Sequence, residues 1–184
     1  CWGANASSQL GTGDVTSRGT VTVPGVTDAA QVCGSLEHTC YRSRGGDVYC
    51  WGQGVEGMLG TGATTQLRRV PATPVAGLSG VVDIFCGVRF TCAMQPAAAG
   101  GREVYCWGSV AGDRLGERLS ANRLAPSTPV PGLPSDVVAF ARHGGAAMTT
   151  CVRTAAGEAW CWGSNAGSLR GTGGTASIGP SRVV

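Results

Sequence analysis

The triplet Cys-Trp-Gly, which occurs four times, constrains the fold of this chain more than any other feature. Its copies begin at Cys1, Cys50, Cys106 and Cys161, at spacings of 49, 56 and 55 residues. A repeat of this length that holds several short apolar runs and no helical stripe is typical of one four-stranded propeller blade. The repetition therefore predicts an all-β fold of consecutive antiparallel β-propeller blades.

Further landmarks follow each triplet in the same order. A glycine stands ten residues after each triplet cysteine, and a leucine precedes it in three units, at Leu10, Leu59 and Leu115. A Pro-Gly segment and an apolar run such as 81–85 come next, and three units close on Thr-Cys. Glycine supplies 31 of the 184 residues, more than twice the usual share of ~7%. We expect one propeller segment with repeats at about 1–49, 50–105, 106–160 and, incomplete, 161–184.

The units also differ from one another. Phe90 stands in the second unit where the first has His38, and His143 lies in a lengthened segment that has no counterpart elsewhere. The tryptophans of the triplets recur once per unit, so we expect them to pack between blades rather than to stack on a ligand.

The order Cys-Trp-Gly, Leu-Gly-Thr-Gly, Pro-Val-x-Gly-Leu, apolar run and Cys-Gly-x-x-x-His-Thr-Cys resembles the bacterial form of the regulator of chromosome condensation repeat, over essentially the whole chain. The resemblance implies a seven-bladed propeller, of which this chain holds about three and a half blades. We expect the remaining blades to come from a longer chain. Association of two copies and an open arc are the next alternatives.

Six of the nine cysteines form pairs with hairpin spacing. The members lie ten, fourteen and ten residues apart around glycine-containing turns, and the pairs are Cys40–Cys50, Cys92–Cys106 and Cys151–Cys161. Directly opposed residues of a non-hydrogen-bonded antiparallel pair lie close enough for a disulfide, and an even insertion keeps both sulfurs on one face. We predict three strand-to-strand disulfides, with buried free thiols as the alternative.

The remaining cysteines lack such a hairpin partner. Cys33 and Cys86 occupy equivalent places in successive units; we expect buried free thiols there, with a bridge between blades as the alternative. The chain has no Cys-x-x-Cys pair and only two histidines, so we expect no metal and no cofactor. Because disulfides persist in oxidising compartments, the pattern predicts an extracytoplasmic protein, in the periplasm, at the cell surface or secreted.

Charge and hydropathy narrow the range of partners. The 14 basic residues are all arginine, and 11 acidic residues leave a net charge of +3, which is too mild to indicate nucleic-acid binding. No apolar stretch approaches the ~18 residues that span a bilayer. We therefore expect no specific nucleic acid and no membrane span.

The differences between units gather in expected loops, which carry recognition in rigid scaffolds. The candidate partner-binding residues are Arg42, Arg44, Arg68, Arg69, Arg114, Arg118 and His143. Arginine is favoured at protein interfaces, although a solvated charged rim explains any single one equally well. We predict an extracytoplasmic binding or scaffold module that recognises a protein or a cell-surface polymer.

Two other functions are weaker. The resemblance also implies guanine nucleotide exchange on a small GTPase with chromatin binding, which conflicts with the predicted disulfides and the modest charge. An enzyme is disfavoured because no nucleophile elbow, phosphate loop, metal motif or paired carboxylates are evident. The His38-Thr39-Cys40 sequence belongs to the repeat pattern, and its cysteine is assigned to a disulfide.

Overall fold

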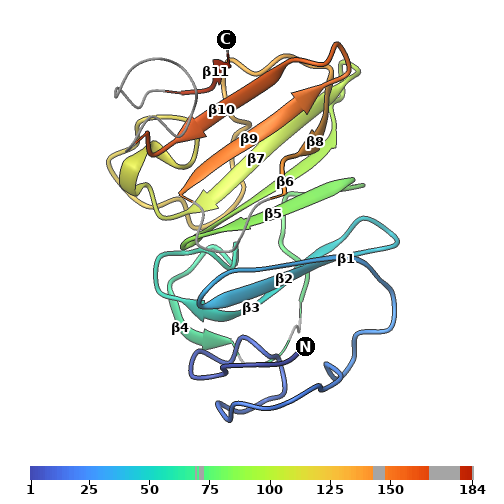
Figure 1. Cartoon of the computed structure of the whole chain (residues 1–184), viewed down its shortest axis with the longest axis vertical. Coiled ribbons are helices and arrows are strands. Elements are labelled where there is room, and N and C mark those ends of the chain that lie inside the picture. The colour runs from blue at the N-terminus through green and yellow to red at the C-terminus, as the bar shows by residue number, and fades with distance from the viewer. Residues whose placement is uncertain (69, 71–72, 143–147, 166–178, 184) are drawn as a thin grey trace.

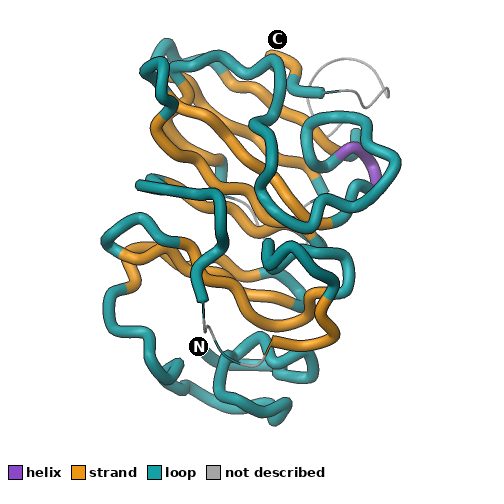
Figure 2. The backbone as a smooth tube through the Cα atoms, turned by 180° about the vertical axis from the view of Figure 1, so that it is seen from behind, coloured by secondary structure: helices purple, strands orange, loops and turns teal. Residues whose placement is uncertain are grey.

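Three antiparallel sheets stand in chain order along the molecule in the computed structural model (Figure 1). The structure describes residues 1–68, 70, 73–142, 148–165 and 179–183. The helical element in these ranges is a single 3-10 turn, Ala111–Asp113, and strands and loops make up the rest (Figure 2). No helix in the described part of the chain is long and apolar enough to cross a membrane.

The first and third sheets have four strands each. The order β1-β2-β3-β4 joins Ala29–Gly34, His38–Ser43, Val48–Gly54 and Thr65–Arg68. The third sheet, in the order β11-β10-β9-β8, joins Ser181–Arg182, Ala159–Gly163, Thr149–Thr154 and Val137–Phe140. Each strand pairs mainly with its neighbour in sequence, as glycine-rich hairpins dictate.

The second sheet has three strands, β5 (Asp83–Gly87), β6 (Phe90–Pro96) and β7 (Arg102–Gly108). The segment 123–129 runs along β7, with isolated β-bridges between Gly108 and Arg123 and between Tyr105 and Pro129. This segment occupies the place of a fourth strand. Three of the four triplets fall on β3, β7 and β10, so the sequence repeats that begin at Cys50 and Cys106 start in one sheet and end in the next.

The core lies between the sheets. One buried cluster, which includes Val48, Ile84 and Trp107, fills the space between the first and second sheets. Another, which includes Phe85, Leu115 and Trp162, lies between the second and third. Face-to-face burial of one sheet on the next is what a four-stranded sheet needs to cover its apolar surface.

The tryptophan of each buried triplet packs against the Leu-Gly turn of the preceding repeat. Trp51 and Trp107 are buried, and a Cβ added to Gly11 or Gly60 would come within 3 Å of the respective indole. Only glycine therefore fits the Leu-Gly turn beneath each ring. Trp162 packs near Gly116 in the same way, which matches the expected role between blades. Trp2 differs, because this residue is 76% exposed.

Candidate binding face

The six hairpin cysteines are joined as three disulfides in the structure. Their pairs are Cys40–Cys50, Cys92–Cys106 and Cys151–Cys161, each with a Cα–Cα distance of 4.1 Å. In every case the two residues are direct partners in the strand register. Each disulfide therefore ties the second strand of a sheet to the third.

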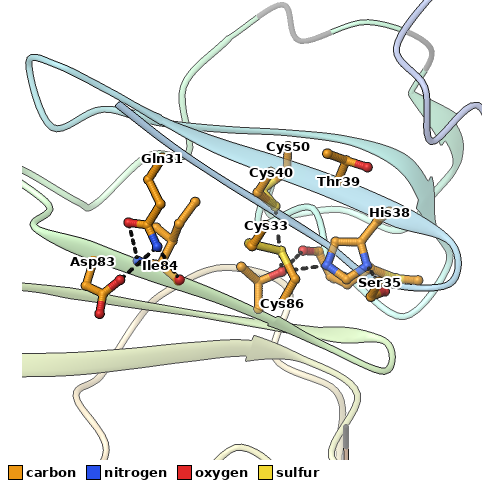
Figure 3. Close-up of a disulfide and its surroundings, with 12 residues drawn as sticks. Gln31, Cys33, Ser35, His38, Thr39, Cys40, Cys50, Asp83, Ile84 and Cys86 are labelled. Atoms are coloured by element: carbon orange, nitrogen blue, oxygen red, sulfur yellow. Dashed lines mark hydrogen bonds between the residues drawn. A yellow bond between two sulfur atoms is a disulfide. The ribbon is translucent and has the colours of Figure 1, made fainter. Parts of the chain in front are cut away.

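The structure corrects the expectation of free thiols at Cys33 and Cys86. These residues form a fourth disulfide, with a Cα–Cα distance of 5.5 Å and a sequence separation of 53 residues. The bond joins β1 of the first sheet to β5 of the second (Figure 3). Equivalent positions on the first strands of neighbouring sheets come together because those strands lie side by side. Among the described residues, Cys1 is the free cysteine.

The candidate arginines do not form one cluster. Arg42 and Arg44 lie at the β2–β3 hairpin end of the first sheet, where Arg44 is exposed. Arg118 is exposed in the loop after β7, near the opposite end. Arg68 ends β4 at the sheet edge, and Arg69 and His143 lie outside the described residues.

Arg114 departs from the expected exposed contact. Only 8% of it is exposed, because its guanidinium donates through Nη1 to Val88 O at 2.6 Å and through Nε to Ala111 O. The charge lies 6.0 Å from the centre of the Phe90 ring, and desolvation lowers the pKa of Arg114. Arg114 is therefore held within its loop by backbone carbonyls, and it lines the hollow described next.

A hollow of about 340 Å³ opens where the loops of all three sheets meet. Its walls come from the β1–β2 loop, the segment after β3, the β5–β6 turn, the loop after β7 and the residue before β9. Leu36 and Met148 on its rim are 62% and 48% exposed. This hollow combines an apolar rim with charged groups, which is the chemistry of a binding site.

Arg89 is the charged centre of the hollow. Its Nη1 donates to Glu56 Oε1 at 2.7 Å and its Nε donates to Glu37 Oε2 at 3.1 Å. The hydrogen bond that Arg89 donates to Glu56 and the negative charge of Glu37 raise the pKa of Arg89. Its φ of +59° lies in the left-handed region, which costs a non-glycine residue free energy and is frequent at functional positions.

Sequence reasoning missed Arg89, although a signal for it existed. Cys86 and Cys92 are six residues apart, whereas Cys33 and Cys40 are seven apart. The second unit must therefore join its first two strands by a tighter turn, Val88-Arg89, and a tighter turn forces the unusual φ.

His38 is a buried link between sheets. It is fully buried, and this desolvation lowers its pKa to about 4, so the ring is neutral at neutral pH. Its Nδ1 lies 2.9 Å from Ser35 Oγ (Figure 3). Its Nε2 lies 2.9 Å from Thr91 Oγ1. Since Thr91 Oγ1 donates its proton to Met58 O, Nε2 is the donor to Thr91. Cys40 is in a disulfide, so His38 has no thiolate beside it to activate.

Comparison with known proteins agrees with the repeat architecture. Two family models described as the regulator of chromosome condensation (RCC1) repeat match residues 45–94 and 30–57. The chain belongs to the RCC1-repeat family. The human E3 ubiquitin-protein ligase HERC2 is 34% identical over 137 residues, which are 71% of this chain and 3% of HERC2. The ultraviolet-B receptor UVR8 of Arabidopsis thaliana is 30% identical over 131 residues, 68% of this chain and 28% of UVR8.

Solved structures show the fold of this RCC1-repeat chain. A chain in the crystal structure of Kap60 bound to yeast RCC1 (Prp20) superposes with a TM-score of 0.80 at 18% identity, covering all of this chain and 44% of that one. Human WBSCR16 gives a TM-score of 0.77 at 23% identity and 47% coverage of its chain. The sheets are propeller blades, about three and a half of them, and the chain spans less than half of each relative named here.

Proposed function

We propose that this RCC1-repeat segment belongs to an extracytoplasmic, non-catalytic module that binds a protein partner at the hollow around Arg89. The observation that carries the proposal is the pairing of exposed Leu36 and Met148 with a fixed ionic centre in one cavity. Interfaces obtain most of their affinity from a few such anchors, in which an apolar contact adjoins an arginine.

The hollow is preorganised for binding. Two acidic side chains hold Arg89, and disulfides tie strands of all three adjoining blades. A partner therefore does not have to order the site, and the entropic cost of association falls. The exposed apolar area of Leu36 and Met148 is then available to stabilise the complex.

The proposed location rests on the disulfides. Eight of the nine cysteines are bonded, a density typical of proteins from oxidising compartments and rare in cytosolic ones. A mass measurement on protein from its native source, alkylated before reduction, tests this. Modification of one cysteine supports the proposal, and modification of all nine contradicts it.

Binding is tested with the oxidised chain as bait for proteins of the native extracellular medium. Leu36→Asp and Met148→Asp, which place charges on the apolar rim, should each reduce capture of the partner at least about tenfold. Arg153→Ala, an exposed site on β9 away from the hollow, is the matched control. Arg44→Ala reports on the opposite end of the blades; loss of capture there alone would place binding at the hairpin end instead.

Guanine nucleotide exchange on a small GTPase is the alternative. Prp20p of Saccharomyces cerevisiae, which has binding properties to Gsp1p and histones, has a similar fold, but at 15% identity this likeness shows the fold alone. Nucleotide release from a panel of small GTPases decides between the two functions. Acceleration that survives Leu36→Asp would favour exchange and count against the hollow.

A further inference from the structure

Two disulfides lie beside each other at the interface of the first and second blades. The sulfurs of Cys33, Cys40 and Cys86 are within 4.8 Å of one another, although they belong to two different bonds, Cys33–Cys86 and Cys40–Cys50 (Figure 3). Within the ranges that the structure describes, no other three cysteines come so close.

The strand register gives Cys40 a second partner. Cys40 is directly opposite Cys50 on β3 and also directly opposite Cys33 on β1. The Cα–Cα distance of 4.1 Å to Cys50 marks a narrow, non-hydrogen-bonded pair, so on the other side Cys40 forms the wide pair with Cys33. Such pairs have Cα atoms about 5.5 Å apart, which a disulfide accommodates.

Access is unequal among these sulfurs. Cys33 is half-buried, whereas Cys40 and Cys50 are fully buried and Cys86 is 3% exposed. An external thiol therefore reaches the Cys33–Cys86 bond before it reaches Cys40–Cys50. The rate of exchange depends on such access to the attacked sulfur.

The geometry points to a thiol–disulfide exchange site. Exchange there replaces the Cys33–Cys86 disulfide, which joins two blades, by a Cys33–Cys40 disulfide within the first blade. A small dithiol reduces Cys33–Cys86 to two thiols and leaves as its own disulfide. The Cys33 thiolate then attacks Sγ of Cys40; the Cys40–Cys50 bond breaks, and Cys50 leaves as a thiolate that takes up the proton lost by Cys33. The product has a Cys33–Cys40 bond and thiols at Cys50 and Cys86.

The consequence concerns the interface rather than the proposed binding function. In the oxidised chain a disulfide ties β1 to the second blade, whereas in the product β1 is tied to β2 and no disulfide joins the two blades. A modest amount of reductant would thus unlink the blades while leaving the first blade cross-linked.

Partial reduction of the whole chain tests the site, because cleavage after arginine separates the two states. Cys33 and Cys40 share the peptide 19–42, Cys50 lies in 45–68 and Cys86 in 70–89. After one equivalent of dithiothreitol, acid quenching and alkylation, we expect peptide 19–42 with an internal disulfide, and alkylated 45–68 and 70–89. Alkylated Cys33 and Cys86 with an intact bond between 19–42 and 45–68 would overturn the inference.

A variant tests the second step without reductant. Cys86→Ser leaves a thiol at Cys33, and we expect it to displace Cys50, so that alkylation of Cys50 rises at least about tenfold over the unmodified chain. Cys151→Ser is the matched control, since it leaves one thiol in a hairpin with no second disulfide nearby. Folded Cys86→Ser protein that is alkylated at Cys33 alone contradicts exchange.

Discussion

The two interfaces between consecutive blades are built from the same repeat yet are held together differently. Between the first and second blades, Trp107 Nε1 and Thr91 Oγ1 both donate to Met58 O. His38 adds its hydrogen bond to Thr91, and the Cys33–Cys86 disulfide makes the contact covalent. Trp107, Thr91 and His38 therefore all have hydrogen-bond partners at this interface.

Between the second and third blades, the corresponding donors are Trp162 Nε1 and Thr150 Oγ1, which are buried without a hydrogen-bond partner among the described residues. Phe90 replaces the histidine there, and Arg114 replaces Met58 in the Leu-Gly turn. Other contacts hold this interface: the Phe85 and Phe140 rings lie 5.9 Å apart.

Asp83 provides the polar link at the second interface. The buried carboxylate accepts from Phe140 N at 2.8 Å and from Arg142 Nη2 at 2.5 Å. It also accepts from Gln31 Nε2 at 2.8 Å, so it connects the first strands of three blades. The first interface thus has polar contacts both at its tryptophan and between the first strands, whereas at the second interface the tryptophan indole has no partner among the described residues and the first strands carry the polar contacts.

The largest expected effect comes from removing the covalent link of the first interface. The double variant Cys33→Ala/Cys86→Ala, which leaves neither thiol of this bond, should lose about 4 kcal/mol of unfolding free energy, because the bond closes a loop of 53 residues. Chemical denaturation under non-reducing conditions measures the loss, with Cys1→Ser as control. A loss of unfolding free energy below about 1 kcal/mol would show that this disulfide does not make the first interface more stable than the second.

The next effect depends on pH and should be confined to the first interface. Burial lowers the pKa of His38 from 6.5 to about 4. Between these two pH values His38 is therefore protonated in the unfolded chain and neutral in the folded chain. This contribution is fully present above pH 6.5 and is lost as the pH falls toward 4, up to about 3 kcal/mol. Denaturation at pH 7 and pH 4 measures it.

The control is His38→Phe, which copies the second interface into the first. At pH 7 the unfolding free energy of the variant should be about 1 kcal/mol lower, because phenylalanine cannot form the hydrogen bonds to Thr91 and Ser35. The pH dependence due to His38 should also be absent. An unchanged slope between pH 4 and pH 6.5 in the variant would assign the acid sensitivity to other groups.

At the second interface, Asp83→Asn should cost about 2 kcal/mol, because an amide turns one of its two acceptor atoms into a donor facing other donors. Thermal or chemical unfolding measures the cost. Arg142→Ala is the comparison: its side chain is 60% exposed, so the loss should stay below about 1 kcal/mol. Equal losses would mean that the exposed ion pair, not the buried hydrogen bonds, carries the interface.

Sequence reasoning reached the features that depend on local register. Ten residues around a glycine turn set Cys40 opposite Cys50, because hairpin pairing is fixed by the turn. It gave the Cys33–Cys86 bond only as the alternative to free thiols, since that contact depends on how two blades pack across 53 residues. The hollow was missed for a similar reason: loops of three blades form it, and Arg114, read as a surface residue, turns inward over Phe90.

The smallest effect concerns the ion pairs that Arg89 adds to the first interface. Arg89 lies between β5 and β6 of the second blade, whereas Glu37 and Glu56 lie in the first blade, before β2 and after β3. Of the Arg89 side chain, 47% is exposed. A double-mutant cycle of Arg89→Ala with Glu56→Gln should give a coupling of only about 0.2–1 kcal/mol, smaller at high salt. Loss of partner capture without a matching loss of stability would then separate binding at the hollow from cohesion of the blades. A coupling above about 2 kcal/mol would instead make Arg89 a structural element of the first interface, comparable to His38.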